Sequence, residues 1–181
     1  PVEVLALSGD PLPTAATLSA GDRQGVQVGD AVVTSEGLVG RVIEVYPTLS
    51  RATLLSDANQ AIACVVESTG VNGILRFTPA PFPRMVLTSV PLADTLRPGQ
   101  MVLTSNLSVR WPRGIPVGRI TRVTSDASGL LQEAEVQPMA RLSRLRHAFV
   151  APRPDGFANA GPAPAYVSSL EMALLRRRVE E

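Results

Sequence analysis

The chain alternates apolar and polar side chains over short runs, with turn-forming residues between them about every ten residues. A period of two predicts strands with one buried face, because successive side chains of a strand point to opposite sides. Proline, glycine, asparagine and aspartate stand between the runs and predict turns. The runs lie at residues 51–55, 62–67, 73–77, 85–90, 129–136 and 148–150. This pattern predicts an all-β fold of small barrels or sandwiches.

A hairpin-like stretch occurs twice in the chain. Residues 29–45 read GDAVVTSEGLVGRVIEV, while residues 99–105 and 116–123 read GQMVLTS and PVGRITRV. Each copy predicts two strands joined by a turn, so the sequence predicts a duplicated module. The second copy carries eight more residues between its strands, and insertions of this kind belong in loops rather than strands.

Five glycines mark turns and crossings in this module. Gly29 and Gly99 open the two copies, and Gly37 ends the short turn of the first copy, where positive φ is needed. Gly40 and Gly118 lie inside strand patterns. A glycine there indicates a β-bulge or the close approach of another backbone, and strongly curled sheets need such points.

The composition excludes several kinds of chemistry. All 17 basic residues are arginine against 16 acidic residues, and a net charge of +1 predicts no nucleic-acid partner. The lack of lysine excludes a phosphate-binding P-loop, a Schiff base and a Ser–Lys pair. The only histidine, His147, stands among arginines, and Cys64 lies in an apolar run that predicts burial. We therefore expect no catalytic residue, no metal and no cofactor.

Aromatic residues outside the strand patterns are candidates for partner binding. The longer loop of the second copy holds the only tryptophan, Trp111, between two arginines. Such a side chain suits an interface anchor, but it could also fold back and close a barrel end, and the sequence leaves both possibilities open. Phe77 and Phe82 flank the proline cluster and form a second candidate patch, although core burial suits Phe77 better. The partner-binding candidates are Arg110, Trp111, Arg113, Ile115, Phe77 and Phe82.

The pattern changes after residue 151. Residues 152–164 are rich in proline and glycine and predict an extended linker. Ser168 and Glu171 behind it have the spacing of a capping box, which predicts a short amphipathic helix. This helix is expected either to meet a partner helix or to dock on its own barrel.

Several fragments occur in a characteristic order: residues 25–42, 54–62, 97–105 with 114–119, and 129–145. Together they resemble the MreC family of rod-shape-determining proteins over roughly residues 17–150. One departure concerns the glycine-rich second loop of the family, which usually carries a phenylalanine before its prolines. Here residues 106–111 read NLSVRW, so the shape of this loop is expected to differ.

The resemblance implies a non-enzymatic scaffold of the bacterial cell-elongation machinery, which builds peptidoglycan and maintains rod shape. It implies an inner-membrane anchor and a coiled coil upstream, followed by two small six-stranded β-barrels in the periplasm. It also implies binding to a class B penicillin-binding transpeptidase, RodA, MreD and MreB, and self-association into dimers or filaments. No apolar run here approaches the length of a membrane span, so the anchor is expected outside this piece.

On this basis the expected organisation has three parts. The first barrel is expected at residues 1–74, completed by a returning strand at 145–150, and the second at 75–144. The linker and helix occupy 151–181. Two other functions stay open: a two-barrel protease of the chymotrypsin type with His147 as its base, and a β-barrel adaptor of a secretion system.

Overall fold

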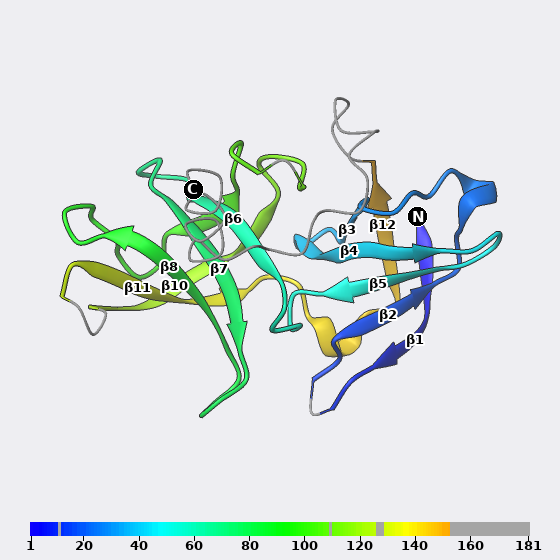
Figure 1. The fold of residues 1–181 in the computed structure, drawn as a ribbon, viewed down its shortest axis with the longest axis horizontal. Helices are drawn as coiled ribbons and strands as arrows, with labels where there is room; N and C mark the ends of the chain where they lie inside the picture. The colour runs from blue at the N-terminus through cyan, green and yellow to red at the C-terminus, as the bar shows by residue number, and fades with distance from the viewer. Residues whose placement is uncertain (11, 109, 126–128, 153–181) are drawn as a thin grey trace, which may run out of the picture.

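The computed structural model describes residues 1–10, 12–108, 110–125 and 129–152, which form two closed six-stranded β-barrels side by side (Figure 1). Barrel 1 contains β1 (Val2–Ser8), β2 (Ala15–Leu18), β3 (Ala31–Val33), β4 (Leu38–Val45), β5 (Ser50–Leu54) and β12 (His147–Ala151). Barrel 2 contains β6 (Ala61–Val66), β7 (Asn72–Thr78), β8 (Arg84–Pro91), β9 (Met101–Thr104), β10 (Pro116–Ser125) and β11 (Leu131–Pro138). The predicted all-β fold of two small barrels is confirmed.

The border between the barrels lies earlier in the chain than expected. Barrel 1 uses five consecutive strands up to Leu54, and β12 then returns to lie between β1 and β3. Strand β6 pairs with β7 and β9 in barrel 2, so the expected border after residue 74 is wrong. The alternation of side chains reveals a strand but not its pairing partner, which explains the error. The expected linker and helix lie outside the described residues from position 153 onward.

The two copies of the repeat form the same turn and hairpin. In each copy the opening glycine donates its N–H to the second strand, and the side chain of the next residue accepts a backbone N–H from three residues earlier. The corresponding hydrogen bonds are Gly29 N to Val42 O (2.8 Å), Gly99 N to Ile120 O (2.7 Å), Gln27 N to Asp30 Oδ2 (2.9 Å) and Arg97 N to Gln100 Oε1 (2.7 Å). A carboxylate and an amide therefore hold equivalent turns.

The strand glycines lie where another backbone passes close by. A Cβ atom on Gly40 would lie 2.0 Å from the carbonyl oxygen of Thr53, and one on Gly118 would lie 2.4 Å from that of Gln137. Gly37 adopts a φ of 147°, in the region that favours glycine. Gly37 thus takes a turn conformation, and Gly40 and Gly118 lie at close strand crossings.

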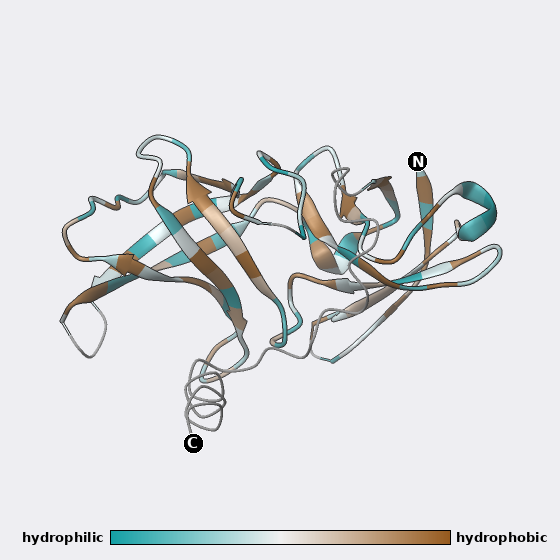
Figure 2. Ribbon diagram, turned by 45° about the horizontal axis from the view of Figure 1, so that its top comes forward, coloured by the Kyte–Doolittle hydropathy of each residue, from teal (hydrophilic) through white to brown (hydrophobic). Residues whose placement is uncertain are grey.

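The apolar interiors of the barrels meet at their junction. Barrel 1 is filled by buried residues such as Leu18, Val39 and Leu54. The core of barrel 2 continues into barrel 1 through three almost fully buried residues, Ala31, Leu38 and Leu55. Figure 2 shows apolar strand residues on both sides of this junction. Because these residues are buried and apolar, we expect their contact to resist separation of the barrels.

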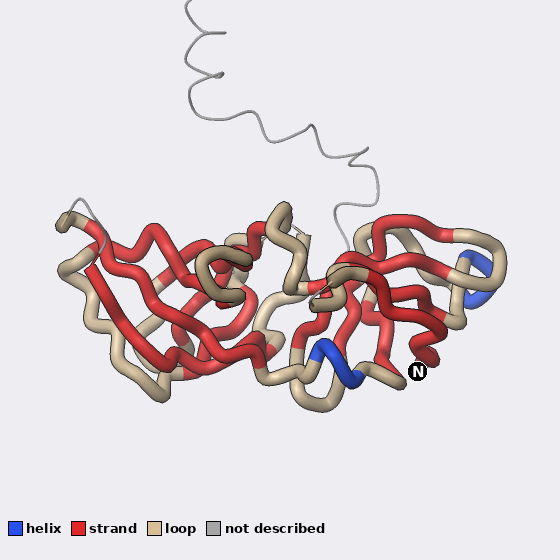
Figure 3. The backbone as a smooth tube through the Cα atoms, turned by 90° about the horizontal axis from the view of Figure 1, so that it is seen from below, coloured by secondary structure: helices blue, strands red, loops and turns tan. Residues whose placement is uncertain are grey.

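The segment between β11 and β12 crosses the junction. It contains the short 3-10 helix η2 (Leu142–Arg144), whereas η1 (Asp22–Gln24) lies at the far end of barrel 1 (Figure 3). Leu142 packs against the apolar cores of both barrels, so η2 is anchored to each of them. No helix among the described residues is long and apolar enough to span a membrane.

Candidate partner-binding surface

Trp111 lies inside the junction of the barrels rather than on the surface. Its side chain is 2% exposed and packs in the core of barrel 2. The guanidinium carbon of Arg41, on β4 of barrel 1, lies 5.8 Å from the centre of its ring. The expectation that Trp111 anchors a partner is therefore wrong, and the side chain folds back over its own molecule. Burial at a ready-made apolar junction removes its large ring from water.

The rest of the Trp111 loop is fixed to β9 by hydrogen bonds. The hydroxyl of Thr104 donates to the carbonyl oxygen of Pro112 (2.6 Å) and accepts from the N–H of Ile115 (2.9 Å). Arg110 and Arg113 are exposed, and Ile115 is half-buried. Of the candidates in this loop, only the two arginines are thus fully available to a partner.

Phe77 and Phe82 belong to one hairpin but differ in exposure. Phe82 lies between β7 and β8, in the hairpin loop that projects at the bottom of Figure 1, and is 74% exposed. Phe77 lies on β7 and is half-buried against the core of barrel 2. Part of the Phe77 side chain is thus used in core packing, whereas Phe82 is free to contact another molecule.

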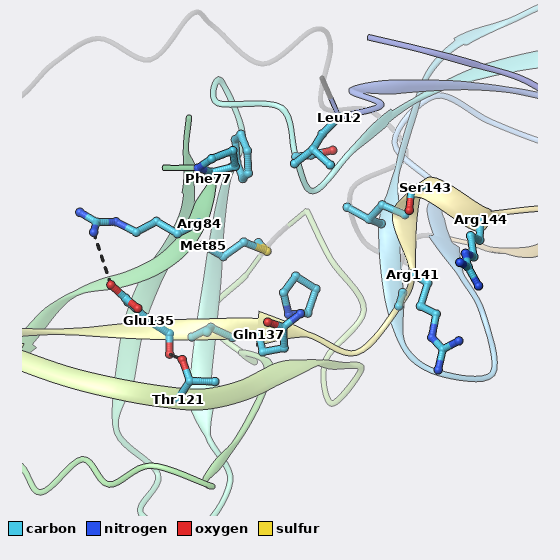
Figure 4. A pocket seen from close by; sticks show the side chains of 16 residues that line it. Leu12, Phe77, Arg84, Met85, Thr121, Glu135, Gln137, Arg141, Ser143 and Arg144 are labelled. Carbon is cyan, nitrogen blue, oxygen red and sulfur yellow. Dashed lines mark hydrogen bonds and ion pairs between the residues drawn. The ribbon is translucent and has the colours of Figure 1, made fainter. Parts of the chain in front are cut away.

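A cleft of about 680 Å³ opens between the barrels next to this hairpin. Leu12, from the β1–β2 loop, and Phe77 form one side, and Met85 lies deep within it (Figure 4). Arg141 and Arg144, next to and within η2, lie at another side, across the cleft from Arg84 and Glu135. Sequence reasoning missed this cleft because its lining comes from segments more than one hundred residues apart, which only the returning β12 brings together.

Charge is distributed unevenly around the cleft. Arg84 forms an ion pair with Glu135 across β8 and β11, with 3.4 Å between Nη1 and Oε1 (Figure 4). Arg141 and Arg144 are exposed, and no carboxylate of the described residues forms an ion pair with either guanidinium. Glu36 instead accepts a hydrogen bond from the backbone N–H of Arg141 (3.3 Å). The η2 side therefore carries two exposed arginines beside one carboxylate, which leaves it net positive.

The reactive side chains singled out in the sequence are not assembled into a site. His147 is exposed on β12, opposite Glu3 of β1, and no described serine hydroxyl is hydrogen-bonded to it. Burial raises the pKa of the Cys64 thiol to about 12, which keeps the thiol protonated. Within the described ranges, no group of three His, Cys, Asp or Glu residues could hold a metal ion. The described surface could thus bind a partner through its cleft, its exposed apolar side chains and its arginines.

Comparisons with known proteins identify the family. A family model described as "Rod shape-determining protein MreC, barrel core" matches residues 4–152, which include all twelve strands except the first two residues of β1. The chain belongs to the MreC family. The cell shape-determining protein MreC of Cereibacter sphaeroides is 31% identical over 182 residues, covering 93% of this chain and 57% of that protein. The chain spans about half the length of the curated MreC relatives that it matches.

Solved MreC structures share the two-barrel architecture. MreC of Listeria monocytogenes superposes with a TM-score of 0.79 at 28% identity, covering 90% of this chain and 78% of that one. A chain in the complex between the penicillin-binding protein PBP2 and MreC from Helicobacter pylori has a TM-score of 0.65 at 15% identity, covering 83% and 94%. At that identity the second likeness concerns the fold alone. The Listeria monocytogenes structure therefore agrees with an MreC barrel core, and the Helicobacter pylori structure agrees with its fold.

Proposed function

We propose that this chain is the barrel core of a non-enzymatic scaffold that binds a class B penicillin-binding transpeptidase and maintains rod shape during cell elongation. The observation that carries the proposal is the family match across both barrels, residues 4–152. The relatives are cell shape-determining proteins, and the Helicobacter pylori MreC forms a complex with PBP2. Binding at a preformed surface would bias the transpeptidase toward one of its conformations.

The wider arrangement is part of the same proposal. The barrels lie on the periplasmic side of the inner membrane, held there by an upstream anchor and coiled coil outside this piece. RodA, MreD and MreB are further partners, and the protein self-associates into dimers or filaments. No cofactor takes part. A buried apolar cluster that spans both barrels supports a scaffold role, because a scaffold must present its surface in a constant orientation.

The transpeptidase surface is proposed at the β7–β8 hairpin. Phe82 supplies an exposed aromatic side chain, and aromatic residues carry much of the binding energy of protein interfaces. Arg110 and Arg113 are exposed on the loop that Trp111 holds in place, at the end of barrel 2 away from this hairpin (Figure 1), so they are proposed as a separate, second contact. Trp111 itself would act only by positioning this loop.

The direct test measures binding of the purified chain to the periplasmic part of the transpeptidase by calorimetry. We expect Phe82→Asp to weaken binding at least tenfold, about 1.4 kcal/mol, because it removes an aromatic anchor and buries a charge. Leu130→Asp is the matched control, since Leu130 is 75% exposed against 74% for Phe82. Failure of the unmodified chain to bind a transpeptidase, with capture of an outer-membrane channel instead, would favour the secretion-adaptor function.

A further inference from the structure

We propose that the cleft between the barrels binds an extended segment of the transpeptidase that carries an apolar side chain and, a few residues away, a carboxylate. The inference rests on the proposed function, since it names the part of the partner that this chain recognises. It adds a further contact, separate from Phe82, whose chemistry can be tested by itself.

The size and lining of the cleft suit a short peptide segment. Its volume of about 680 Å³ lies within the range of roughly 300–1,000 Å³ typical of small-ligand sites. It is thus larger than one side chain needs and too small for a folded domain. The buried residues Met85 and Val136 line it, with Met85 deep inside, and Leu12 and Phe77 border it (Figure 4). This part would accept an aliphatic or aromatic side chain.

The charges at the cleft would set the direction of the bound segment, although the Glu36 carboxylate on the backbone N–H of Arg141 offsets part of the positive charge at η2. Arg84 is already paired with Glu135, so it offers little to a ligand. Arg141 and Arg144 have no ion-pair partner among the described carboxylates, and arginine is well suited to hold a carboxylate through two hydrogen bonds. The apolar side chain would therefore face Leu12 and Phe77, and the carboxylate would face η2.

Both sides of the cleft are held in place before a ligand arrives. At η2, the N–H of Arg144 donates to the carbonyl oxygen of Arg141 (3.0 Å), and Leu142 is packed between the two cores. On the other side, the hydroxyl of Ser56 donates to the carbonyl oxygen of Pro13, which ties the Leu12 loop to the β5–β6 connection. A preformed site loses less conformational entropy on binding than a flexible one.

The charge contact is tested with the double variant Arg141→Glu/Arg144→Glu and the periplasmic part of the transpeptidase. We expect affinity to fall at least tenfold at low salt, and the loss to shrink as salt rises. The matched control is Arg23→Glu/Arg97→Glu, which makes the same charge change at two exposed arginines outside the cleft and should alter affinity less than twofold. If Arg141→Glu/Arg144→Glu fails to fold by circular dichroism, Arg141→Gln/Arg144→Gln takes its place, with a smaller loss expected.

The apolar contact and the location of the segment are tested separately. Leu12→Asp should weaken binding at least fivefold, whereas Leu92→Asp, an exposed leucine outside the cleft lining, should have no effect. Overlapping peptides that together cover the transpeptidase sequence should include one that binds the unmodified chain. When the acidic residue of that peptide is replaced by lysine, the peptide should bind Arg141→Glu/Arg144→Glu more tightly than it binds the unmodified chain. This exchange of preference is not expected from a merely structural effect.

The possible results separate this inference from the proposed function. If the unmodified chain binds the transpeptidase and the cleft variants bind it equally well, the cleft inference is overturned while the proposed function stands. If the unmodified chain binds no transpeptidase, both are overturned. A tenfold gain in affinity for the binding peptide on removal of residues 153–181 would show that this chain's own tail competes for the cleft and would support the assignment. Failure of all the overlapping peptides to bind would overturn it.

Discussion

The two copies of the hairpin have the same backbone conformation but differ in the loop that joins their two strands. In the first copy a short turn ends at Gly37, and a Cβ atom there would lie 2.4 Å from the carbonyl oxygen of Pro116, the first residue of β10. In the second copy the longer loop places Trp111 in the junction, against Arg41 of the first copy. The shared part thus builds each barrel, whereas the unequal part joins the barrels.

Equivalent arginines show the same division. Arg41 and Arg119 occupy matching positions, each directly after the strand glycine of its copy. Arg41 is half-buried and lies over the Trp111 ring, whereas Arg119 is exposed and donates to the carbonyl oxygen of Gly99 (3.0 Å). At the same position of the hairpin, the arginine of the first copy therefore makes a contact across the junction, whereas that of the second copy makes a contact within its own turn.

The largest expected effect comes from removing the ring at the junction. Trp111→Ala should lower the free energy of unfolding by about 4 kcal/mol, because it leaves a cavity in a core that both barrels share. Urea unfolding followed by circular dichroism measures this change. Phe82→Ala is the control and should cost less than about 0.5 kcal/mol, since its ring is mostly in solvent. Similar losses for both variants would contradict the junction role of Trp111.

The shared part of the repeat is tested at the strand glycines. Gly40→Ala should destabilise by about 3 kcal/mol, because its methyl group would meet the backbone of β5, which cannot move without opening the barrel. Gly118→Ala should have a similar effect in barrel 2, if the two hairpins are equivalent. Gly99→Asn is the control, since Gly99 has open space around it and asparagine tolerates positive φ. Thermal unfolding of the three variants gives the comparison, and a tolerated Gly40→Ala would show that the strand crossing is not rigid.

The strands, the repeat and the roles of the strand glycines can be predicted from the sequence, because each depends on residues that are close together in the chain. Alternation gives the strands, and Gly40 and Gly118 interrupt the pattern at the same position of each copy. The pairing of β6 with β9 depends on contacts between residues such as Cys64 and Thr104, far apart in sequence, and alternation has no information on them. For this reason the border between the barrels was misplaced.

The candidate site was only partly predictable for the same reason. Phe82 could be found, because an aromatic residue within a proline-rich turn has no strand to bury it. The burial of Trp111 could not be decided, since the apolar junction that receives it includes Ala31, Leu38 and Leu55 from barrel 1. The cleft was not visible at all, because Leu12 and Arg141 meet only in the folded chain.

A smaller effect, the pH dependence of stability, concerns the buried cysteine of barrel 2. Burial holds the pKa of Cys64 at about 12 against its ordinary 9.0, so the folded state keeps a proton that the unfolded state loses. Stability should therefore be unaffected below about pH 9 and fall as the pH rises from 9 to 12, by on the order of 1 kcal/mol at pH 10. Urea unfolding at pH 8 and pH 10 should show this extra loss in the unmodified chain but not in Cys64→Ala. Equal losses would mean that the thiol is not buried in the folded state.

The smallest effect separates the two equivalent arginines. Arg41→Met should cost roughly 1 kcal/mol, because it removes the cation over the Trp111 ring but keeps a side chain of similar length. Arg119→Met should cost less than about 0.5 kcal/mol, since its contact to Gly99 is exposed to water. A double-mutant cycle of Arg41→Met with Trp111→Leu isolates the interaction, and a coupling energy of about 0.5–1 kcal/mol is expected. Zero coupling, or equal losses for both arginines, would show that the two copies of the hairpin are joined by apolar packing alone.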